Sequence, residues 1–258
     1  MHTFLRAAEE LEADAARERI DYLEDQGLLA SSVLDAGCGN GHSVLEMRAR
    51  GMSAVGIDSS WYRLSRWLAE GRAGAFVLAD ASALPFPSNH FGAVISSGLL
   101  EHVGVSEQSA PYRVCSLPYK HTARAMVLVE LQRVSSGAVV VDFPNGSFPI
   151  DFWHGDRLGA FRVHATPDPL NPSLRQVRSY IPGSRLTLLP LRNRLRFRQV
   201  SCRWWGRLLA PRVCAWLRFL DLLPRHVPLL SLLYPFLVIR IEPAASNPSL
   251  QRTRFARR

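Results

Sequence analysis

Short apolar runs recur along the first 143 residues, and each is followed by a polar or glycine-rich turn and a segment with helical spacing. Strands that are apolar along their whole length suit a parallel sheet whose two faces are both covered by helices. Five such repeats predict an α/β fold with a doubly wound parallel sheet. The predicted strands of this sheet are residues 32–36, 53–57, 75–79, 93–97 and 138–143.

Apolar residues at helical spacing predict five helices, the first of which ends at Gly27, a residue suited to a helix C-cap. The pattern then changes, because residues 144–190 hold seven prolines and show little periodicity. We interpret this segment as an insertion of loops and short pieces that serves as a substrate lid, since loops at the carboxyl ends of strands often contact substrates. The predicted helices are residues 9–26, 42–50, 61–70, 126–134 and 207–223.

Two further strands are predicted after the insertion. Arginine alternates with other residues over 192–200, which predicts a strand with one arginine-rich face, either solvated or directed at a polyanion. An apolar run predicts a last strand over 234–241. The expected parts of this single domain are an N-terminal helix (1–29), a β–α core (30–143), the insertion (144–190), a strand–helix–strand unit (191–242) and a flexible tail (243–258).

The turn after the first predicted strand carries the most specific chemistry, because Asp35 is followed by Gly37, Gly39 and Gly41. Glycine allows positive φ and close approach of a ligand to the backbone, and the following helix presents free N–H groups. The third glycine comes one residue too early for the dinucleotide pattern G-x-G-x-x-G, in which His42 occupies that position. The turn predicts a nucleotide-type site but is a weak signal by itself.

A second acidic residue, Asp58, ends the second predicted strand. Its carboxylate can accept two hydrogen bonds from a ribose diol, as an acid at this position does in dinucleotide folds. Alternatively, Asp58 can cap the next helix together with Ser59 and Ser60. The glycine turn upstream favours ribose binding.

Further motifs follow in order along residues 77–103 and 130–134: an Asp after the third strand, a Leu-Pro-Phe segment, a closing Leu-Glu-His, and Glu-Leu-Gln-Arg-Val. With the acidic residue before G-x-G-x-G, these motifs resemble the small-molecule, type 11-like branch of class I S-adenosylmethionine-dependent methyltransferases. The sequence departs from the family pattern at Gly92, where the family usually has a mainly structural Asp. The resemblance covers about residues 30–143.

The resemblance implies a Rossmann-like, seven-stranded sheet with an antiparallel C-terminal hairpin, and S-adenosylmethionine as the cofactor. It implies that Asp80 and the Ala81 N–H hold the adenine edge. It also places Ser97 at the methionine end of the cofactor and His102 near the transferred methyl group. The residues expected to bind the cofactor are Asp35, Gly37, Cys38, Gly39, Gly41, Asp58, Ser59, Asp80, Ala81 and Ser97.

Methyl transfer from a sulfonium depends mainly on position and orientation, so a catalytic side chain is not obligatory. An oxygen acceptor would need a base, and the candidates are His102 and His154. His154 lies in a crowded stretch, residues 152–157, which suits either a substrate lid or a loop that packs its aromatic residues and leaves His154 inert. Because no His, Asp and Glu cluster at metal-ligand spacing along the chain, we expect no metal and disfavour metal-assisted O-methylation.

The net charge of +9 is unevenly distributed, with a balance of −5 over residues 1–150 and +14 over residues 151–258. Nearly all the positive charge is arginine, which reflects either a GC-rich genome or a basic face for an anionic substrate, membrane surface or nucleic acid. Arginines interleaved with Trp204, Trp205 and Trp216 suit a membrane interface. We therefore hypothesise a small-molecule or lipid-like acceptor, with peripheral membrane contact through the arginine-rich C-terminal half.

Other functions stay open. RNA methylation would use the same basic half, although the segment after the fourth strand lacks the (Asn/Asp)-Pro-Pro-aromatic motif of enzymes that methylate amino groups of bases. An NAD-dependent oxidoreductase is disfavoured by the glycine spacing. A non-catalytic binding module would be expected to have lost the glycine turn, which is intact.

Four scattered cysteines without a C-x-x-C pair predict a reduced protein with neither a disulfide framework nor structural zinc. The first fourteen residues lack the basic start and apolar middle of a signal peptide. The longest apolar window, residues 227–239, is broken by two prolines and is too short to cross a bilayer. We expect a cytoplasmic protein, at most peripherally bound to a membrane, and the sequence leaves its acceptor, the methylated atom and its oligomeric state open.

Overall fold

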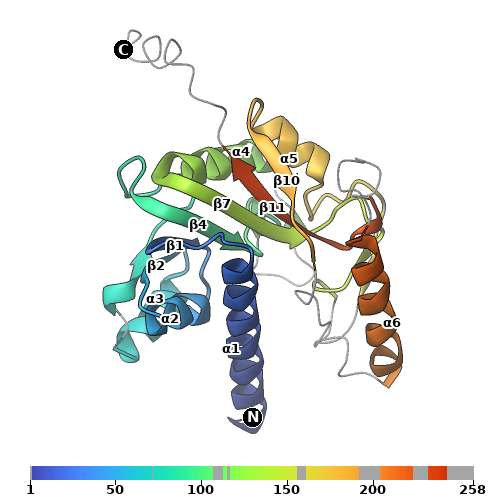
Figure 1. The fold of residues 1–258 in the computed structure, drawn as a ribbon, viewed down its shortest axis with the longest axis horizontal. Coiled ribbons are helices and arrows are strands. Elements are labelled where there is room, and N and C mark those ends of the chain that lie inside the picture. The colour runs from blue at the N-terminus through green and yellow to red at the C-terminus, as the bar shows by residue number, and fades with distance from the viewer. Residues whose placement is uncertain are drawn as a thin grey trace.

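Seven strands form one central sheet in the computed structural model (Figure 1). They are β1 (Ser32–Ala36), β2 (Ser53–Asp58), β3 (Phe76–Leu78), β4 (Phe91–Ser97), β7 (Ser135–Pro144), β10 (Arg185–Leu188) and β11 (Phe236–Glu242). Their order is β10-β11-β7-β4-β1-β2-β3. The five strands from β7 to β3 are parallel neighbours, whereas β11 is antiparallel to both β7 and β10. The predicted Rossmann-like sheet with an antiparallel C-terminal hairpin is thus confirmed.

The structure describes residues 2–71, 73–106, 113–114, 117–155, 161–191, 204–222 and 232–242. The predicted strand over 192–200, the predicted tail over 243–258, and Asp156 and Arg157 of the crowded stretch lie outside these residues. Two short pairs of strands form apart from the main sheet. They are β5 (Val105–Ser106) with β6 (Arg113–Val114), and β8 (Ile150–Asp151) with β9 (Arg162–Val163).

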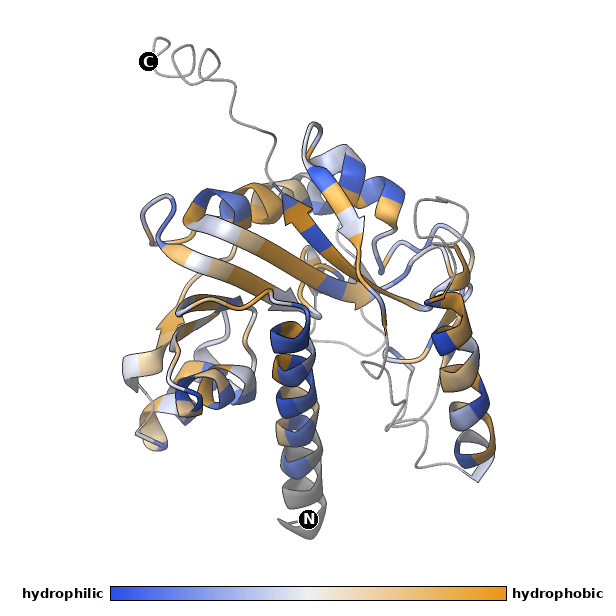
Figure 2. Ribbon diagram, in the orientation of Figure 1, coloured by the Kyte–Doolittle hydropathy of each residue, from blue (hydrophilic) through white to orange (hydrophobic). Residues whose placement is uncertain are grey.

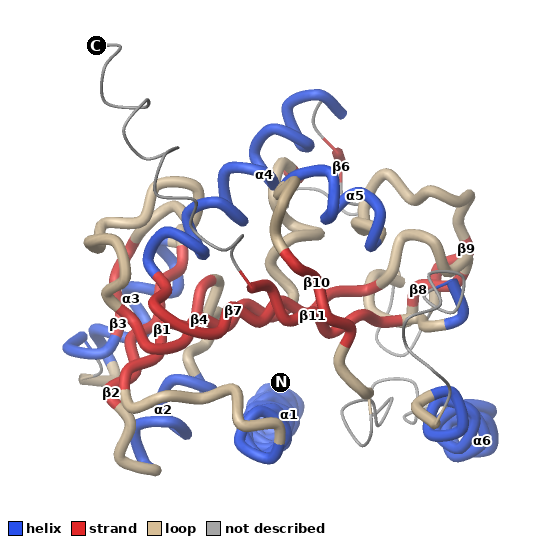
Figure 3. Tube along the Cα trace, turned by 45° about the horizontal axis from the view of Figure 1, so that its top comes forward, coloured by secondary structure: helices blue, strands red, loops and turns tan. Residues whose placement is uncertain are grey.

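Helices cover both faces of the sheet (Figure 3). They are α1 (His2–Asp25), α2 (His42–Ala49), α3 (Trp61–Ala69), α4 (Leu117–Val134), α5 (Leu174–Tyr180) and α6 (Trp204–Leu220), with a 3-10 turn η1 (Ala73–Ala75) before β3. Helices α4 and α5 lie on one side of the sheet, and α1, α2 and α6 lie on the other (Figure 3). This covering on both sides is the reason why the strands are apolar throughout.

The core follows the central strands, which are mostly hydrophobic, whereas α1 is largely hydrophilic (Figure 2). Leu34, Val94, Val139 and Ile239 come from four neighbouring strands and are fully buried. Burying one such aliphatic side chain stabilises a fold by about 1.5–3 kcal/mol. The middle of the sheet therefore holds the turn after β1 on a rigid base.

The predicted end of α1 agrees with the structure, whereas the predicted start of α4 does not. Helix α1 is closed by Gly27 with a φ of 63°, and the Gly27 N–H donates to the carbonyl of Glu24 at 2.8 Å, as the C-cap prediction requires. Helix α4 begins at Leu117, nine residues before the predicted start. Lys120 and Arg124 lie on its buried face, so its first half lacks an apolar stripe.

The insertion contains a helix and a strand of the main sheet. Ser173 and Gln176 form a capping box at the start of α5, with the Ser173 Oγ accepting from the Gln176 N–H at 3.2 Å. Both sides of β11 are paired, with β7 and with β10. The hairpin partner of the last strand is therefore β10 rather than the predicted strand over 192–200. A four-residue strand among prolines is too short to show a period.

Candidate active site

Three glycines shape the turn between β1 and α2. Gly37, Gly39 and Gly41 have φ values of 76°, 57° and 78°, in the left-handed region that favours glycine. The N–H groups of Gly37 and Cys38 both donate to the carbonyl of Ile57 on β2 at 2.9 Å. The turn is thereby fixed to the sheet at the carboxyl end of β1.

The three glycines differ in what surrounds them. A Cβ on Gly41 would lie 2.3 Å from the ring of Phe76, and a Cβ on Gly37 would lie 3.0 Å from Leu99. The nearest atom to a Cβ on Gly39 is in the Arg63 guanidinium, at 3.8 Å. Gly41 and Gly37 are therefore needed for packing, whereas Gly39 borders open space.

Asp58 holds the turn from the end of β2. Its Oδ2 accepts from the Gly39 N–H at 3.0 Å, and its Oδ1 accepts from the Ser60 N–H at 2.9 Å. The N-cap of α3 is Ser60, with the exposed Ser59 between the two, so Asp58 is not itself the helix cap. Each carboxylate oxygen keeps a second lone pair for an outside donor. Burial raises the pKa of the nearby Cys38 thiol above its usual range, so this thiol is not a nucleophile.

Asp35 is a buried carboxylate on β1, directly before the glycine turn. It is 1% exposed, and neither of its oxygens has a hydrogen-bond partner among the described residues. Burial raises its pKa to about 6; Arg19 opposes this shift, while Asp142 and Asp58 add to it. A buried carboxylate without partners is costly, so Asp35 points to a ligand that brings positive charge or N–H donors.

We expect Asp35→Asn to stabilise the ligand-free protein above pH 6. The pKa of Asp35 in the folded chain, about 6, exceeds its ordinary value of 3.8. The folded chain therefore binds the proton more tightly, and the carboxyl group costs stability progressively as pH rises from about 4 to 6. The substitution should raise the free energy of unfolding by about 2–3 kcal/mol at about pH 7.5 and hardly at all near pH 3.5. Urea unfolding at both pH values measures this, and an equal gain at both would contradict it.

Asp80 and Ala81 follow β3 at the same edge of the sheet. The exposed Asp80 has an Oδ1 that accepts from the N–H and from the Oγ–H of Ser82, both at 2.8 Å. The Ala79 N–H donates to the carbonyl of Asp58 at 3.1 Å, which joins the ends of β3 and β2. The structure thus places the predicted ribose and adenine residues along one edge.

Ser97 ends β4 beside the carboxylate of Asp142, which was not among the residues predicted from the sequence to belong to the site. Its Oγ–H donates to the Oδ1 of Asp142, which is 6% exposed near the end of β7. The Gly98 N–H donates to the carbonyl of Asp142 at 2.9 Å. The sequence feature that could have identified Asp142 is that it is the single acidic residue within the apolar run 138–143.

The segment after β4 meets the insertion at two histidines. Glu101, His102 and His154 each offer one ligand-type atom within 4.8 Å of the others, and the two imidazole centroids are 5.3 Å apart. Glu101 is 2% exposed, its Oε2 makes no hydrogen bond to the described residues, and burial raises its pKa to about 7. Burial is the main cause that lowers the pKa of His102 to about 4, and the positive charges of His154 and Lys120 lower it further. The fold thus joins both catalytic candidates to Glu101, which the sequence placed only within the Leu-Glu-His motif.

A buried network orients His154. The Oδ2 of Asp151, a residue only 1% exposed, accepts from His154 Nδ1 and Asn171 Nδ2, both at 2.8 Å, and from Arg162 Nη2 at 3.0 Å. Although burial opposes ionisation, the hydrogen bonds from His154 and Asn171 hold the pKa of Asp151 below its usual range. Asp168 accepts from both Nη1 and Nη2 of Arg162. Because Nδ1 donates to Asp151, Nε2 is the ring nitrogen of His154 that lies away from this carboxylate.

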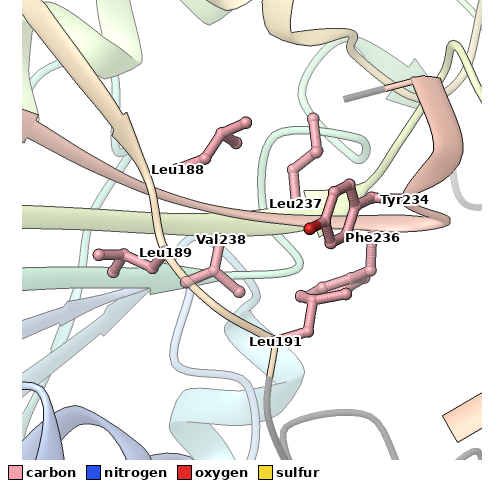
Figure 4. A pocket seen from close by; sticks show the side chains of 7 residues that line it. All are labelled: Leu188, Leu189, Leu191, Tyr234, Phe236, Leu237 and Val238. Carbon is pink, nitrogen blue, oxygen red and sulfur yellow. The ribbon is translucent and has the colours of Figure 1, made fainter. Parts of the chain in front are cut away.

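Aromatic rings form a series from the insertion to α6. Trp153 lies 5.0 Å from Phe236 of β11 and 6.0 Å from Phe152, measured between ring centroids. Phe161 lies 6.5 Å from Phe152 and 5.7 Å from Trp205. A small apolar pocket, which shares Phe236 with this series, is lined by Leu188, Leu189, Leu191, Tyr234, Phe236, Leu237 and Val238 (Figure 4). An aromatic surface that begins at Trp153 therefore adjoins the polar network that orients His154.

Residues 34–116, about a third of the chain, match a family model described as methyltransferase domain. This range includes the glycine turn, Asp58, Asp80 and the Leu-Glu-His segment, whereas Asp142 and His154 lie beyond it. No curated protein matches the chain.

Three solved structures illustrate a distant likeness. The chain is similar to the PH0226 protein from Pyrococcus horikoshii OT3, at 24% identity and a TM-score of 0.37, over 50% of this chain and 58% of that one. It is similar to a SAM-dependent methyltransferase from Aquifex aeolicus, at 17% identity and a TM-score of 0.43, over 67% and 82%. It is also similar to magnesium protoporphyrin IX methyltransferase from Synechocystis PCC 6803 with bound SAH, at 13% identity and a TM-score of 0.46, over 90% and 83%. The match to the first of these spans less than two thirds of that protein.

Proposed function

We propose that this chain is a class I S-adenosylmethionine-dependent methyltransferase and that it transfers the cofactor's methyl group to a small-molecule or lipid-like acceptor. One observation carries the proposal: the segment that matches the methyltransferase domain contains a turn of three positive-φ glycines at the carboxyl end of β1. The acceptor class rests on the aromatic series that begins at Trp153, next to His154 in the insertion.

The residues at this edge fit the cofactor, which carries an ammonium and a sulfonium group at its methionine end. The buried carboxylate of Asp35 lacks a partner among the described residues, so it suits a cationic ligand. Gly39 borders open space, and Asp58 keeps lone pairs for the ribose hydroxyls. In this proposal Asp80 and the Ala81 N–H hold the adenine.

When bound, the cofactor supplies a methyl group activated by the sulfonium. The chain then has to position the acceptor, exclude water and help the acceptor lose its proton. We assign the last task to His102 and His154, which lie ring to ring. With a pKa of about 4, His102 is unprotonated at neutral pH but is a weak base, so it needs help from its neighbours.

The acceptor in this proposal enters between the insertion and the carboxyl edge of the sheet. The aromatic series from Phe236 through Trp153 to Trp205 offers flat apolar surface beside His154. Burying an apolar acceptor there removes carbon surface from water at about 25 cal/mol per Å². An apolar or lipid-like acceptor fits this aromatic surface better than a polyanion does.

Helix α6 supports peripheral membrane contact by the same enzyme. Trp204, Leu208 and Phe219 are 72%, 57% and 57% exposed, and the helix carries three arginines and no acidic residue. Arginines beside exposed aromatic and aliphatic side chains suit a lipid headgroup region. None of the helices in the described part of the chain is long and apolar enough to span a bilayer. Co-sedimentation with anionic but not with neutral vesicles is expected, and equal behaviour with both would contradict this contact.

A labelling experiment tests the function. Cell extract is incubated with the protein and methyl-labelled S-adenosylmethionine, and the lipid, small-molecule and RNA pools are analysed separately by mass spectrometry. Label is expected in the lipid or small-molecule pool and should be absent with the Gly39→Val variant. Label confined to RNA would replace the acceptor class with a polynucleotide. Tight binding of NADH without binding of S-adenosylmethionine would overturn the assignment of the chain as a methyltransferase.

A further inference from the structure

We propose that Glu101, His102 and His154 form a binding site for a divalent transition metal of the zinc class. The inference extends the proposed function to a metal ion. The role of the metal toward the acceptor rests on the proposed function, whereas the metal site itself does not. Metal binding itself can be measured without methyl transfer. The expectation of no metal rested on spacing along the chain, whereas the fold brings these donors together from the segment after β4 and from the insertion.

The donor set has the composition of a catalytic metal site. Two imidazoles and one carboxylate bind zinc, and also iron(II), with at least one coordination position left for a substrate or water. The three ligand atoms lie within 4.8 Å of one another. A tetrahedral ion with bonds of about 2.1 Å separates its ligands by roughly 3.4 Å, so small side-chain rotations would close the site.

The side chain of Glu101 is a buried carboxylate whose surroundings also indicate a bound ligand. Its side chain is almost completely buried, and Oε2 has no hydrogen-bond partner in the described part of the chain. Its backbone is held in place: Lys120 Nζ donates to the Glu101 carbonyl at 3.0 Å, and Arg124 Nε donates to the Leu100 carbonyl at 2.7 Å. A fixed, buried carboxylate oxygen without a partner is costly, and a metal ion would remove that cost.

The surroundings of His154 match those of a metal-bound histidine. A ligating imidazole commonly donates its second N–H to a carboxylate, which fixes the tautomer and the ring orientation. His154 Nδ1 donates to Asp151 at 2.8 Å, and Asp151 is itself held by Asn171 and Arg162. Nε2 is therefore the nitrogen of His154 that would bind the ion in this proposal. We assign Asp151 as a positioning residue for this ligand.

The site lies where the acceptor is expected to react. Glu101 and His102 follow β4 closely, after Ser97, and a Cβ on Gly37 of the glycine turn would already touch Leu99 of the same segment. A hydroxyl bound to a zinc-class ion loses its proton to solvent far more readily than a free one. With both imidazoles bound to the ion, the metal would replace them in promoting loss of the acceptor's proton, and it favours an acceptor with a phenolic or enolic hydroxyl.

The test measures metal rather than activity. The full chain without a histidine tag is stripped with a chelator and titrated with Zn²⁺ and with Co²⁺ by calorimetry, and bound metal is counted by mass spectrometry. One ion per chain is expected. Glu101→Gln and His154→Ala should each abolish stoichiometric binding, and Asp151→Asn should weaken it by about 10- to 100-fold. His90→Ala, which removes an exposed histidine from a loop outside the site, should leave it unchanged.

S-adenosylmethionine binding by each variant reports whether the chain is folded. Absence of stoichiometric metal in wild-type protein that binds S-adenosylmethionine would overturn the metal site and leave the proposed function standing. Unchanged metal binding in both Glu101→Gln and His154→Ala would also overturn it. Stoichiometric metal in a chain that methylates nothing would instead contradict the proposed function and leave the metal site intact.

Discussion

Gly39→Val is expected to lower the affinity for S-adenosylmethionine by roughly 100-fold or more. Gly39 has a φ of 57°, and a β-branched residue there is strained by about 1–3 kcal/mol. If the turn relaxes in the free protein, restoring its shape on binding would lower the affinity by about 5- to 150-fold. Only the Arg63 guanidinium lies within 4 Å of an added Cβ, so the valine side chain would occupy the open space beside the turn. We expect the cofactor to need that space. Isothermal titration calorimetry measures the effect.

Gly51→Val is the matched control for this variant. Gly51 has a φ of 84°, and nothing lies within 4 Å of a Cβ built on it, so valine there brings similar backbone strain away from the turn. It should reduce stability but leave cofactor affinity unchanged. Wild-type affinity in Gly39→Val, or an equal loss in both variants, would remove the glycine turn as the cofactor site.

Arg124→Met is expected to lower the free energy of unfolding by about 3–5 kcal/mol. Arg124 is 1% exposed, and its guanidinium donates to the carbonyls of Leu100 and Leu170, which joins α4 to the segment after β4 and to the insertion. Removing it leaves two buried carbonyls without these donors and takes away one of the positive charges near Glu101. Losses of this kind from buried charged networks are among the largest that single substitutions cause. Urea unfolding followed by circular dichroism measures it.

Arg185→Met provides the comparison, because the Arg185 side chain is 81% exposed at the sheet edge and lies 4.0 Å from Glu242. Surface ion pairs contribute little, so its change should stay within about 0.5 kcal/mol. A loss below about 1 kcal/mol for Arg124→Met would mean that the segment carrying Glu101 and His102 is held by other contacts. The arrangement of the two histidines would then not depend on this guanidinium.

The parallel part of the fold could be predicted because its signals are local. Strand β1 covers the predicted residues 32–36, and β4 differs from its prediction only by two extra residues at its start. Apolar runs and glycine turns repeat within short windows, so each repeat can be recognised without its neighbours. The antiparallel edge strand β10 and the start of α4 gave no such signal, because one is four residues long and the other buries Lys120 and Arg124.

The sequence by itself determined where the proposed cofactor-binding residues lie. Asp58 ends a parallel strand, the glycine turn directly follows one, and Asp35 and Asp80 lie within two residues of a strand end. The carboxyl ends of such strands necessarily meet at one edge. Strand order along the chain was therefore enough to bring these residues together.

Only the tertiary structure decided which residues meet at the proposed acceptor side. The hydrogen bond of Ser97 to Asp142 spans 45 residues, and the meeting of Glu101 and His102 with His154 spans more than 50. These contacts depend on how the insertion packs on the sheet and on the buried network of Asp151. No local periodicity encodes such packing, because long-range side-chain contacts leave no regular spacing along the chain.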